Sequence, residues 1–272
     1  MIPIRDLNPT RRFAWVTLAI IVANVAIFLL WQPTLGGTDL QQQTFYFCQA
    51  EIPWEITHEE NLAEGGAAAR RAIDATYKPG VGAQLQAYLQ RKCPNKSWWE
   101  SIFVSMFLHG GWLHIGGNML FLWIFGNNVE DRLGRITFVV FYLLGGLAAT
   151  GLQLAFDPNS TVPNLGASGA IAAILGAYAV MFPRARVYTV VIFFFITAVE
   201  LPALVVLGGW FVLQLFSGVG SVASHVNGGV AYWAHVGGFG FGMAATWLFF
   251  RRRGQSARPY PAPYVPPRPD DY

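Results

Sequence analysis

Charged residues are scarce in this sequence. Asp, Glu, Lys and Arg make up 12% of its 272 residues, whereas 54% are hydrophobic and the mean hydropathy is +0.39. Soluble domains carry about twice that share of charge, so the composition argues against an ordinary water-soluble globule. The net charge of only +3 gives no indication of nucleic-acid binding. The sequence also lacks an internal repeat, a nucleotide-binding loop and a clustered metal-ligand motif, which leaves the membrane as the environment to consider.

Six long runs carry almost no charge. Residues 13–31 are 19 residues without a charge, and as a helix they would cover about 28 Å of hydrocarbon. Similar runs occupy 102–125, 136–156, 165–182, 187–216 and 229–250. The fifth run is too long for one span, and Glu200 and Pro202 interrupt it. Because proline favours the first turn of a helix, we place 187–199 at the membrane interface and begin this span near Pro202. The sequence predicts an all-α, polytopic membrane bundle of six transmembrane helices.

At the chain ends and in the short loops, arginines flank the predicted spans on one side only; the basic residues of the long loop 32–101 do not count, because long loops translocate largely regardless of charge. These arginines precede the first span, separate the second from the third and the fourth from the fifth, and follow the sixth (Arg5, Arg11, Arg12, Arg132, Arg135, Arg184, Arg186, Arg251, Arg252 and Arg253). The short opposite loops, 157–163 and 217–228, contain no Lys or Arg. The positive-inside rule therefore predicts a multi-pass protein of the cell membrane with both termini cytoplasmic. No small-residue cleavage site follows the first span, so we expect a retained signal anchor.

These spans divide the chain into segments. We expect a cytoplasmic N-terminus (1–12), a first span (13–31), an extracytoplasmic loop with short helices (32–101), a core of five spans (102–250) and a disordered, proline-rich cytoplasmic tail (251–272). Within the loop, 58–77 and 81–92 have helical composition, with a break at 78–80. Both cysteines, Cys48 and Cys93, lie in this loop. In an oxidising compartment they can form a disulfide or remain two unrelated thiols, and the sequence leaves this choice open.

Polar residues interrupt the predicted spans at His109, His114, Asn118, Ser168 and His235. Polar groups in lipid are costly and usually face the protein interior. Each has a purely structural explanation, because a serine in a membrane helix commonly bonds its own i−4 carbonyl. A buried histidine or asparagine can serve as an interhelical contact worth about 0.6 kcal/mol on average. Their arrangement therefore carries more information than any one of them.

Ser168 and His235 are predicted to meet. Each lies near the start of a span, and the two spans run in the same direction, so the side chains reach a similar depth. Both belong to stripes of small residues at helical spacing, with Ala172 and Gly176 beside Ser168, and Gly238 and Gly242 beside His235. Small residues allow close helix packing, which would bring the imidazole beside the hydroxyl. This is the nucleophile–base arrangement of a serine hydrolase.

The second span offers hydrogen-bond donors. His114 and Asn118 are four residues apart and share a helical face, whereas His109 lies about 140° around the helix from His114. Two donors on one stripe can stabilise an oxyanion, by about 2.7–4 kcal/mol per donor. The rival interpretation is a metal site of three histidines. The spacing of His109 and His114 does not suit one helical face, and no cysteine or carboxylate lies nearby, so we expect no metal and no other cofactor.

Three segments, HGGWLHIGGNML (109–120), GASGA (166–170) and AHVGGFGFG (234–242), resemble in order the signature segments of rhomboid intramembrane serine proteases of the bacterial type. The segment NNVEDRLG (127–134) is similar to the loop after that family's second span. The resemblance covers 103 to about 250. It implies a dyad without aspartate, with Ser168 as nucleophile and His235 as general base, and an oxyanion site formed by the Ser168 N–H, His114 and Asn118. It also implies active-site or structural roles for His109, Gly166, Gly169, Gly238, Gly242, Glu130 and Arg132.

The chain departs from some family members at two places. Some members have a tyrosine four residues after the serine, stacked on the histidine, where this sequence has Ala172. Another aromatic residue, such as Trp233, could support the ring, or none does. Some members also have a tryptophan–arginine pair where this chain has Glu100 and Ser101, and the adjacent Trp98 and Trp99 suggest that an interfacial role is kept.

The resemblance implies an intramembrane endopeptidase that cleaves membrane proteins in or near their transmembrane segments. Its partners would be such substrates and the lipid bilayer, and no sequence feature indicates an oligomeric state. One alternative is a non-catalytic rhomboid-like protein that binds membrane clients, although such relatives typically lack the serine or the histidine. Another is a transporter with a histidine proton relay. That function needs an acidic partner at the same depth, and Glu200 is the only acidic residue within a membrane run.

The charge pattern generates a topological prediction. Reporter fusions after Arg253 and within 130–135 should report a cytoplasmic location, and fusions at Ala67 and Asn159 an external one, because arginine-rich loops stay inside. Paired phosphatase and fluorescent-protein fusions measure this. A cytoplasmic signal at Ala67 would contradict the depth assigned to Ser168 and His235.

Overall fold

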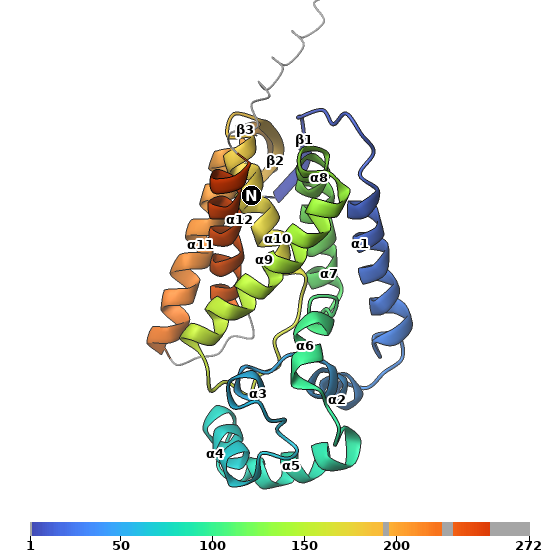
Figure 1. Cartoon of the computed structure of the whole chain (residues 1–272), viewed down its shortest axis with the longest axis vertical. Helices are drawn as coiled ribbons and strands as arrows, with labels where there is room; N and C mark the ends of the chain where they lie inside the picture. Colours follow the sequence, from blue (N-terminus) through green and yellow to red (C-terminus); the bar gives the residue numbers. More distant parts are fainter. Residues whose placement is uncertain (1, 193–195, 225–230, 251–272) are drawn as a thin grey trace, which may run out of the picture.

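The computed structural model describes residues 2–192, 196–224 and 231–250 (Figure 1). The predicted tail (251–272) and part of the predicted loop 217–228 lie outside these residues. The described elements, in chain order, are β1 (Ile2–Asp6), α1 (Trp15–Ala26), η1 (Ile27–Trp31), α2 (Asp39–Gln49), α3 (Pro53–His58), α4 (Gly66–Thr76), α5 (Val81–Lys92), α6 (Trp98–Ser105), α7 (Trp112–Phe121), η2 (Leu122–Gly126), α8 (Asn127–Leu133), α9 (Arg135–Phe156), α10 (Ser168–Met181), β2 (Arg186–Ile192), β3 (Ile196–Pro202), α11 (Ala203–Ser224) and α12 (Tyr232–Phe249).

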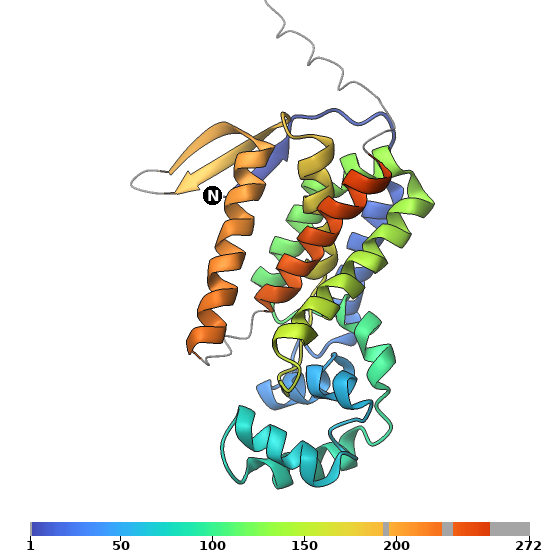
Figure 2. The same cartoon turned by 60° about the vertical axis from the view of Figure 1, so that its left-hand side comes forward.

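The fold is predominantly helical, as predicted, and it has three parts (Figure 1). The long helices form one bundle. The shorter helices α2 to α5 lie together beyond one end of the bundle, and the strands lie at the other end. Figure 2 shows α11 standing at the edge of the bundle, whereas α10 lies among its other helices.

The long apolar helices fit a membrane protein, but not all of them are long enough to span a bilayer alone. Among the described helices, Arg135–Phe156 and Ala203–Gly220 combine the length and hydropathy needed to cross a membrane, and Trp15–Trp31 and Ser168–Met181 are shorter apolar helices. The count of six spans therefore stays a prediction. The start of α11 at Ala203 agrees with the span expected near Pro202.

The second predicted run is not a single helix. The helix α6 ends at Ser105 and α7 begins at Trp112, so His109 lies in the connection between them. Gly111, at the start of α7, has φ 156°. The angle of 140° expected between His109 and His114 around one helix is therefore wrong, because the chain leaves the helix between these two residues.

The helix α10 forms the centre of the bundle. Every residue from Gly169 to Ala179 is buried, against α9 on one side and α12 on the other. Glycines allow backbones to touch here: a Cβ on Gly238 would lie 2.1 Å from the carbonyl oxygen of Gly169, and one on Gly176 would lie 2.2 Å from that of Phe239. The structure thus agrees with the predicted close packing of the two small-residue stripes.

A three-stranded antiparallel sheet was not anticipated by the sequence analysis. The strands β2 and β3 form a hairpin in which Val187 pairs with Leu201, and β1 adds to β2 with Ile2 opposite Val190. The hairpin occupies the segment 187–199 that was expected to lie at the membrane interface. Its sequence, RVYTVVI in β2, is rich in the β-branched and aromatic residues that favour strands, although its hydrophobicity resembles that of a membrane helix.

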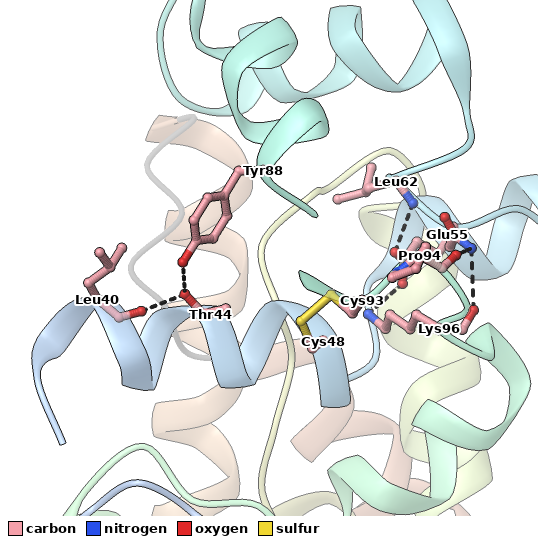
Figure 3. Close-up of a disulfide and its surroundings, with 10 residues drawn as sticks. Leu40, Thr44, Cys48, Glu55, Leu62, Tyr88, Cys93, Pro94 and Lys96 are labelled. Atoms are coloured by element: carbon pink, nitrogen blue, oxygen red, sulfur yellow. Dashed lines mark hydrogen bonds and ion pairs between the residues drawn. A yellow bond between two sulfur atoms is a disulfide. The ribbon is translucent and has the colours of Figure 1, made fainter. Parts of the chain in front are cut away.

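The helices α2 to α5 form a domain with its own core, which includes Ile52, Trp54, Leu62, Ile73 and Leu89. The helix α5 has the predicted bounds, whereas the helix predicted over 58–77 is present only as α4, from Gly66. A disulfide joins Cys48 to Cys93, with 5.6 Å between their Cα atoms (Figure 3). This is the pairing that the sequence left open. Beside it, the Lys96 ammonium lies 2.6 Å from the buried Glu55 carboxylate.

The contact between α10 and α12 generates a matched pair of variants. A Cβ on Gly242 would lie 2.0 Å from the carbonyl oxygen of Ala173, whereas a Cβ on Gly240 meets nothing within 4 Å. We expect Gly242→Ala to cost about 1–3 kcal/mol through overpacking, and Gly240→Ala to be neutral or slightly stabilising. Thermal unfolding in detergent, followed by tryptophan fluorescence, measures both. Equal Tm values would contradict the close packing of these helices.

Candidate active site

Ser168 and His235 form a hydrogen-bonded pair. Ser168 is the first residue of α10, and His235 lies in the first turn of α12. The hydroxyl Oγ of Ser168 lies 2.7 Å from Nε2 of His235, and both residues are half-buried. Because Ser168 begins its helix, its backbone N–H has no carbonyl partner one turn earlier. The positive end of the helix dipole also lies at this point.

The other nitrogen of the His235 ring is bound by a residue that sequence analysis did not identify. Nδ1 of His235 lies 2.9 Å from Oε1 of Gln214, on α11. Trp210, one turn earlier on α11, has its ring 5.8 Å from the imidazole. Trp233, which the sequence suggested as a support for this ring, instead stacks on Phe156 with centroids 3.7 Å apart. The sequence held no signal for Gln214, a single amide within an apolar run.

His114 is held beside Ser168. Its Nδ1 accepts a hydrogen bond from the Gly110 N–H (3.2 Å), so in the neutral ring Nε2 carries the proton and is a donor. Gly166 lies between His114 and Ser168. It has φ 134°, and a Cβ there would lie 2.9 Å from Nε2 of His114 and 3.3 Å from Oγ of Ser168. Glycine is therefore required both by the backbone conformation and by the space.

Asn118 supplies a second donor on α7, one turn after His114. Its side chain is buried, with 8% of its surface exposed, and no described residue accepts a hydrogen bond from its Nδ2. An unpaired buried amide costs free energy, which a group that binds there would recover. His114 and Asn118 both lie on α7, four residues apart, as a shared face requires.

His109 is held by hydrogen bonds to its backbone, and its ring packs against His114. Its backbone exchanges two hydrogen bonds with the Gln32 side chain: Nε2 donates to the carbonyl oxygen (2.9 Å), and the N–H donates to Oε1 (3.0 Å). The Tyr46 hydroxyl donates to the same carbonyl (3.1 Å). The buried imidazole packs edge-on against that of His114, with centroids 5.2 Å apart. No group of three or more His, Cys, Asp or Glu side chains converges in the described part of the chain, and the absence of a metal stays a prediction.

A small cavity adjoins Ser168 and contains a second residue that the sequence did not reveal. Its volume of about 40 Å³ has room for a few water molecules. Glu51, between α2 and α3, lines it together with Ser105, Thr150 and Ser168. The Thr150 hydroxyl donates to the Glu51 carboxylate (2.9 Å), and the backbone carbonyl of Glu51 accepts from the Asn164 N–H (2.8 Å). Glu51 therefore connects the α2–α5 domain with the loop before Ser168.

Glu130 and Gly169, two of the other predicted residues, make contacts that hold helices together. Glu130, on α8, accepts hydrogen bonds from the backbone N–H groups of Val16 (3.1 Å) and Thr17 (2.7 Å), and so caps the start of α1. Figure 1 places α8 at the end of the bundle opposite the α2–α5 domain. Arg132 follows on the same helix. A Cβ on Gly169 would lie 2.6 Å from that of Ala149, so Gly169 allows α9 to approach α10.

Comparison with known proteins identifies the family. Residues 95–252, more than half of the chain, match the model of the Rhomboid domain, and the chain belongs to the rhomboid family. It is therefore a multi-pass membrane protein.

The chain is 29% identical over 198 residues to "Rhomboid protein 1, mitochondrial" of Saccharomyces cerevisiae, covering 70% of this chain and 54% of that protein. It is 31% identical over 110 residues to "Presenilin-associated rhomboid-like protein A, mitochondrial" of Danio rerio (40% and 29%). It is 30% identical over 154 residues to "Rhomboid protease GluP" of Bacillus subtilis (57% and 26%). The similarity extends beyond bacterial rhomboids, and the chain spans about half or less of the length of these relatives.

Glu51 generates a prediction about pH. Burial raises the pKa of its carboxyl to about 7, against smaller opposite effects of Thr150, Asn164 and the Lys96 ammonium. Between about pH 4.5 and 7 the unfolded chain loses this proton while the folded protein keeps it, so the carboxyl's contribution to stability falls as the pH rises. Glu51→Gln resembles the protonated carboxyl and removes this dependence. We expect its Tm advantage over the wild type to grow from pH 5 to 7 and then level off. A constant difference would contradict the burial of a titrating group.

Proposed function

We propose that this rhomboid-family protein is an intramembrane serine endopeptidase. The proposal rests chiefly on one observation, the contact of 2.7 Å between Oγ of Ser168 and Nε2 of His235. An unassisted serine hydroxyl is scarcely nucleophilic at neutral pH, and an adjacent base activates it. A relative that is named a rhomboid protease, GluP, supports the same activity.

The chemical steps follow the general scheme of acyl transfer. Oγ of Ser168 attacks the carbonyl carbon of the scissile peptide bond while Nε2 of His235 takes the hydroxyl proton. The tetrahedral intermediate collapses, the C–N bond breaks, and the imidazolium returns the proton to the leaving amine. A water molecule then attacks the acyl ester with His235 again as the base, which releases the carboxylic acid and restores the hydroxyl. The cavity beside Ser168 is a suitable place for this water.

The oxyanion formed in each half-reaction requires donors. The backbone N–H of Ser168, Nε2–H of His114 and Nδ2 of Asn118 are the three that the proposal assigns, because each is a donor near the start of α10 or on the facing stripe of α7. A single donor of this kind is worth about 2.7–4 kcal/mol in transition-state stabilisation. Asn118 is well suited, since its buried amide has no acceptor among the described residues.

The substrates that we propose are transmembrane segments of other membrane proteins. Ser168 lies at the end of α10 that faces the extramembrane domain, so a substrate helix would unwind there to expose its carbonyl. In α11 we propose a lateral gate, because it stands at the edge of the bundle (Figure 2) and many of its side chains are exposed, Leu213 and Phe216 among them. The six spans, the segment boundaries and the cytoplasmic termini in a cell membrane belong to this proposal.

Substitution of the dyad tests this function. Ser168→Ala should abolish cleavage of a single-span substrate in proteoliposomes with little change in Tm, because it removes one oxygen from a site already lined by small residues. His235→Ala should be equally inactive, and the double variant should cost little more, since residues that act as a unit are strongly non-additive. Asn118→Ala should retain activity reduced by about 10²–10³-fold.

Ser101→Ala is the matched control, because the Ser101 hydroxyl donates to the carbonyl oxygen of Trp98 in its own helix (2.6 Å). We expect it to cleave like the wild type. If Ser168→Ala cleaved at the wild-type rate, the protease assignment would be wrong. A wild type that binds single-span clients without cleaving them would instead favour the non-catalytic, client-binding function.

A further inference from the structure

Gln214 is an unusual residue for its position. Its neighbours on α11 are apolar and exposed, with Leu213 at 65% and Val212 at 47% exposed surface. A polar side chain on such a helix is expensive in lipid and tends to face the protein interior. The amide of Gln214 does so, and its Oε1 lies 2.9 Å from Nδ1 of His235.

The inner face of α11 brings this amide to the imidazole. Trp210, Gln214 and Gly218 are spaced four residues apart and share one face of the helix. The Trp210 ring lies 5.8 Å from that of His235. A Cβ on Gly218 would lie 3.3 Å from the Trp233 side chain, so α11 and α12 approach closely one turn beyond Gln214. The His235 ring is therefore in contact with an amide and an aromatic ring from the same face of α11.

The contact with Gln214 affects which ring nitrogen of a neutral His235 carries the proton. One ring nitrogen carries the proton and the other is an acceptor. An amide oxygen only accepts, so Oε1 of Gln214 favours the proton on Nδ1 and leaves the lone pair of Nε2 directed at Oγ of Ser168. The opposite tautomer would place a proton on Nε2, which could then not take the one from the serine. In serine proteases a partner on Nδ1 fixes the working tautomer in this way.

We propose that Gln214 is a positioning residue, which holds His235 in the tautomer and orientation that its role as base requires. This inference rests on the proposed protease function and adds a third member, from α11, to the Ser168–His235 pair. Gln214 touches neither the substrate nor the reacting atoms, so its effect is transmitted through the imidazole. Because an amide is neutral, it orients the ring without adding a charge beside it.

The test compares three variants. Gln214→Leu is close in volume but has no acceptor, and Gln214→Glu restores an acceptor at the same place. Phe211→Leu is the control, because Phe211 lies on the same helix and stacks on Phe239 of α12 (4.6 Å) without a polar contact to the imidazole. For each we would measure kcat and KM on a single-span substrate, the rate of Ser168 labelling by a fluorophosphonate, and Tm.

We expect Gln214→Leu to lower kcat and the labelling rate by about 10–100-fold, as the loss of the residue that orients a metal-bound histidine does, with KM little changed. Gln214→Glu should recover most of both rates. Phe211→Leu should lower Tm at least as much as Gln214→Leu while its labelling rate stays within about two-fold of the wild type. Equal rates for Gln214→Leu and the wild type would overturn the inference, as would equal losses in both leucine variants. Failure of the proposed protease function would look different, because the wild type itself would then neither cleave the substrate nor be labelled at Ser168.

Discussion

The helices α10 and α12 pack with their backbones in direct contact. Gly176, Gly238 and Gly242 each face a backbone carbonyl that would lie 2.0–2.2 Å from an added Cβ. Side chains of ordinary size would separate these helices and lengthen the hydrogen bond between Ser168 and His235, because each residue lies in the first turn of one of them. Small residues in this bundle therefore do more than fill space, since they set the distance between the Ser168 hydroxyl and the His235 imidazole.

A second set of contacts holds the loops of the candidate site from the side of the α2–α5 domain. Gln32 and Tyr46 bind the backbone of His109, and the backbone of Glu51 pairs with Asn164, close before Gly166. Tyr46 lies on α2, the helix whose last turn carries Cys48, and Glu51 follows it closely. The disulfide and the core of the α2–α5 domain thus stabilise segments that in turn position His114 and Ser168. This domain therefore contributes to the order of the candidate site.

The sequence predicted those features that depend on local spacing. The stripes around Ser168 and His235, and the shared face of His114 and Asn118, are visible because residues three and four apart are neighbours on a helix. Gln214 lies 21 residues before its partner His235, and Glu51 lies 99 residues before its partner Thr150. In each pair the two residues belong to different elements, so no periodicity in the sequence connects them. The hairpin of β2 and β3 was missed because its apolar residues run on directly into those of α11, so that 187–199 was placed at the membrane interface, and because its partner β1 lies at the other end of the chain.

The short, enclosed helix α10 has a consequence for how the protein is made. Its 14 residues extend about 21 Å, less than the roughly 30 Å of a bilayer's hydrocarbon core. It presents almost no side chain to its surroundings, so lipid can neither match its length nor pack against its surface of small residues as its neighbours do. The helix therefore becomes stable in the membrane only in company with α9 and α12. Because α12 follows both α9 and α10 along the chain, α10 gains its full set of packing partners only after α12 has been synthesised.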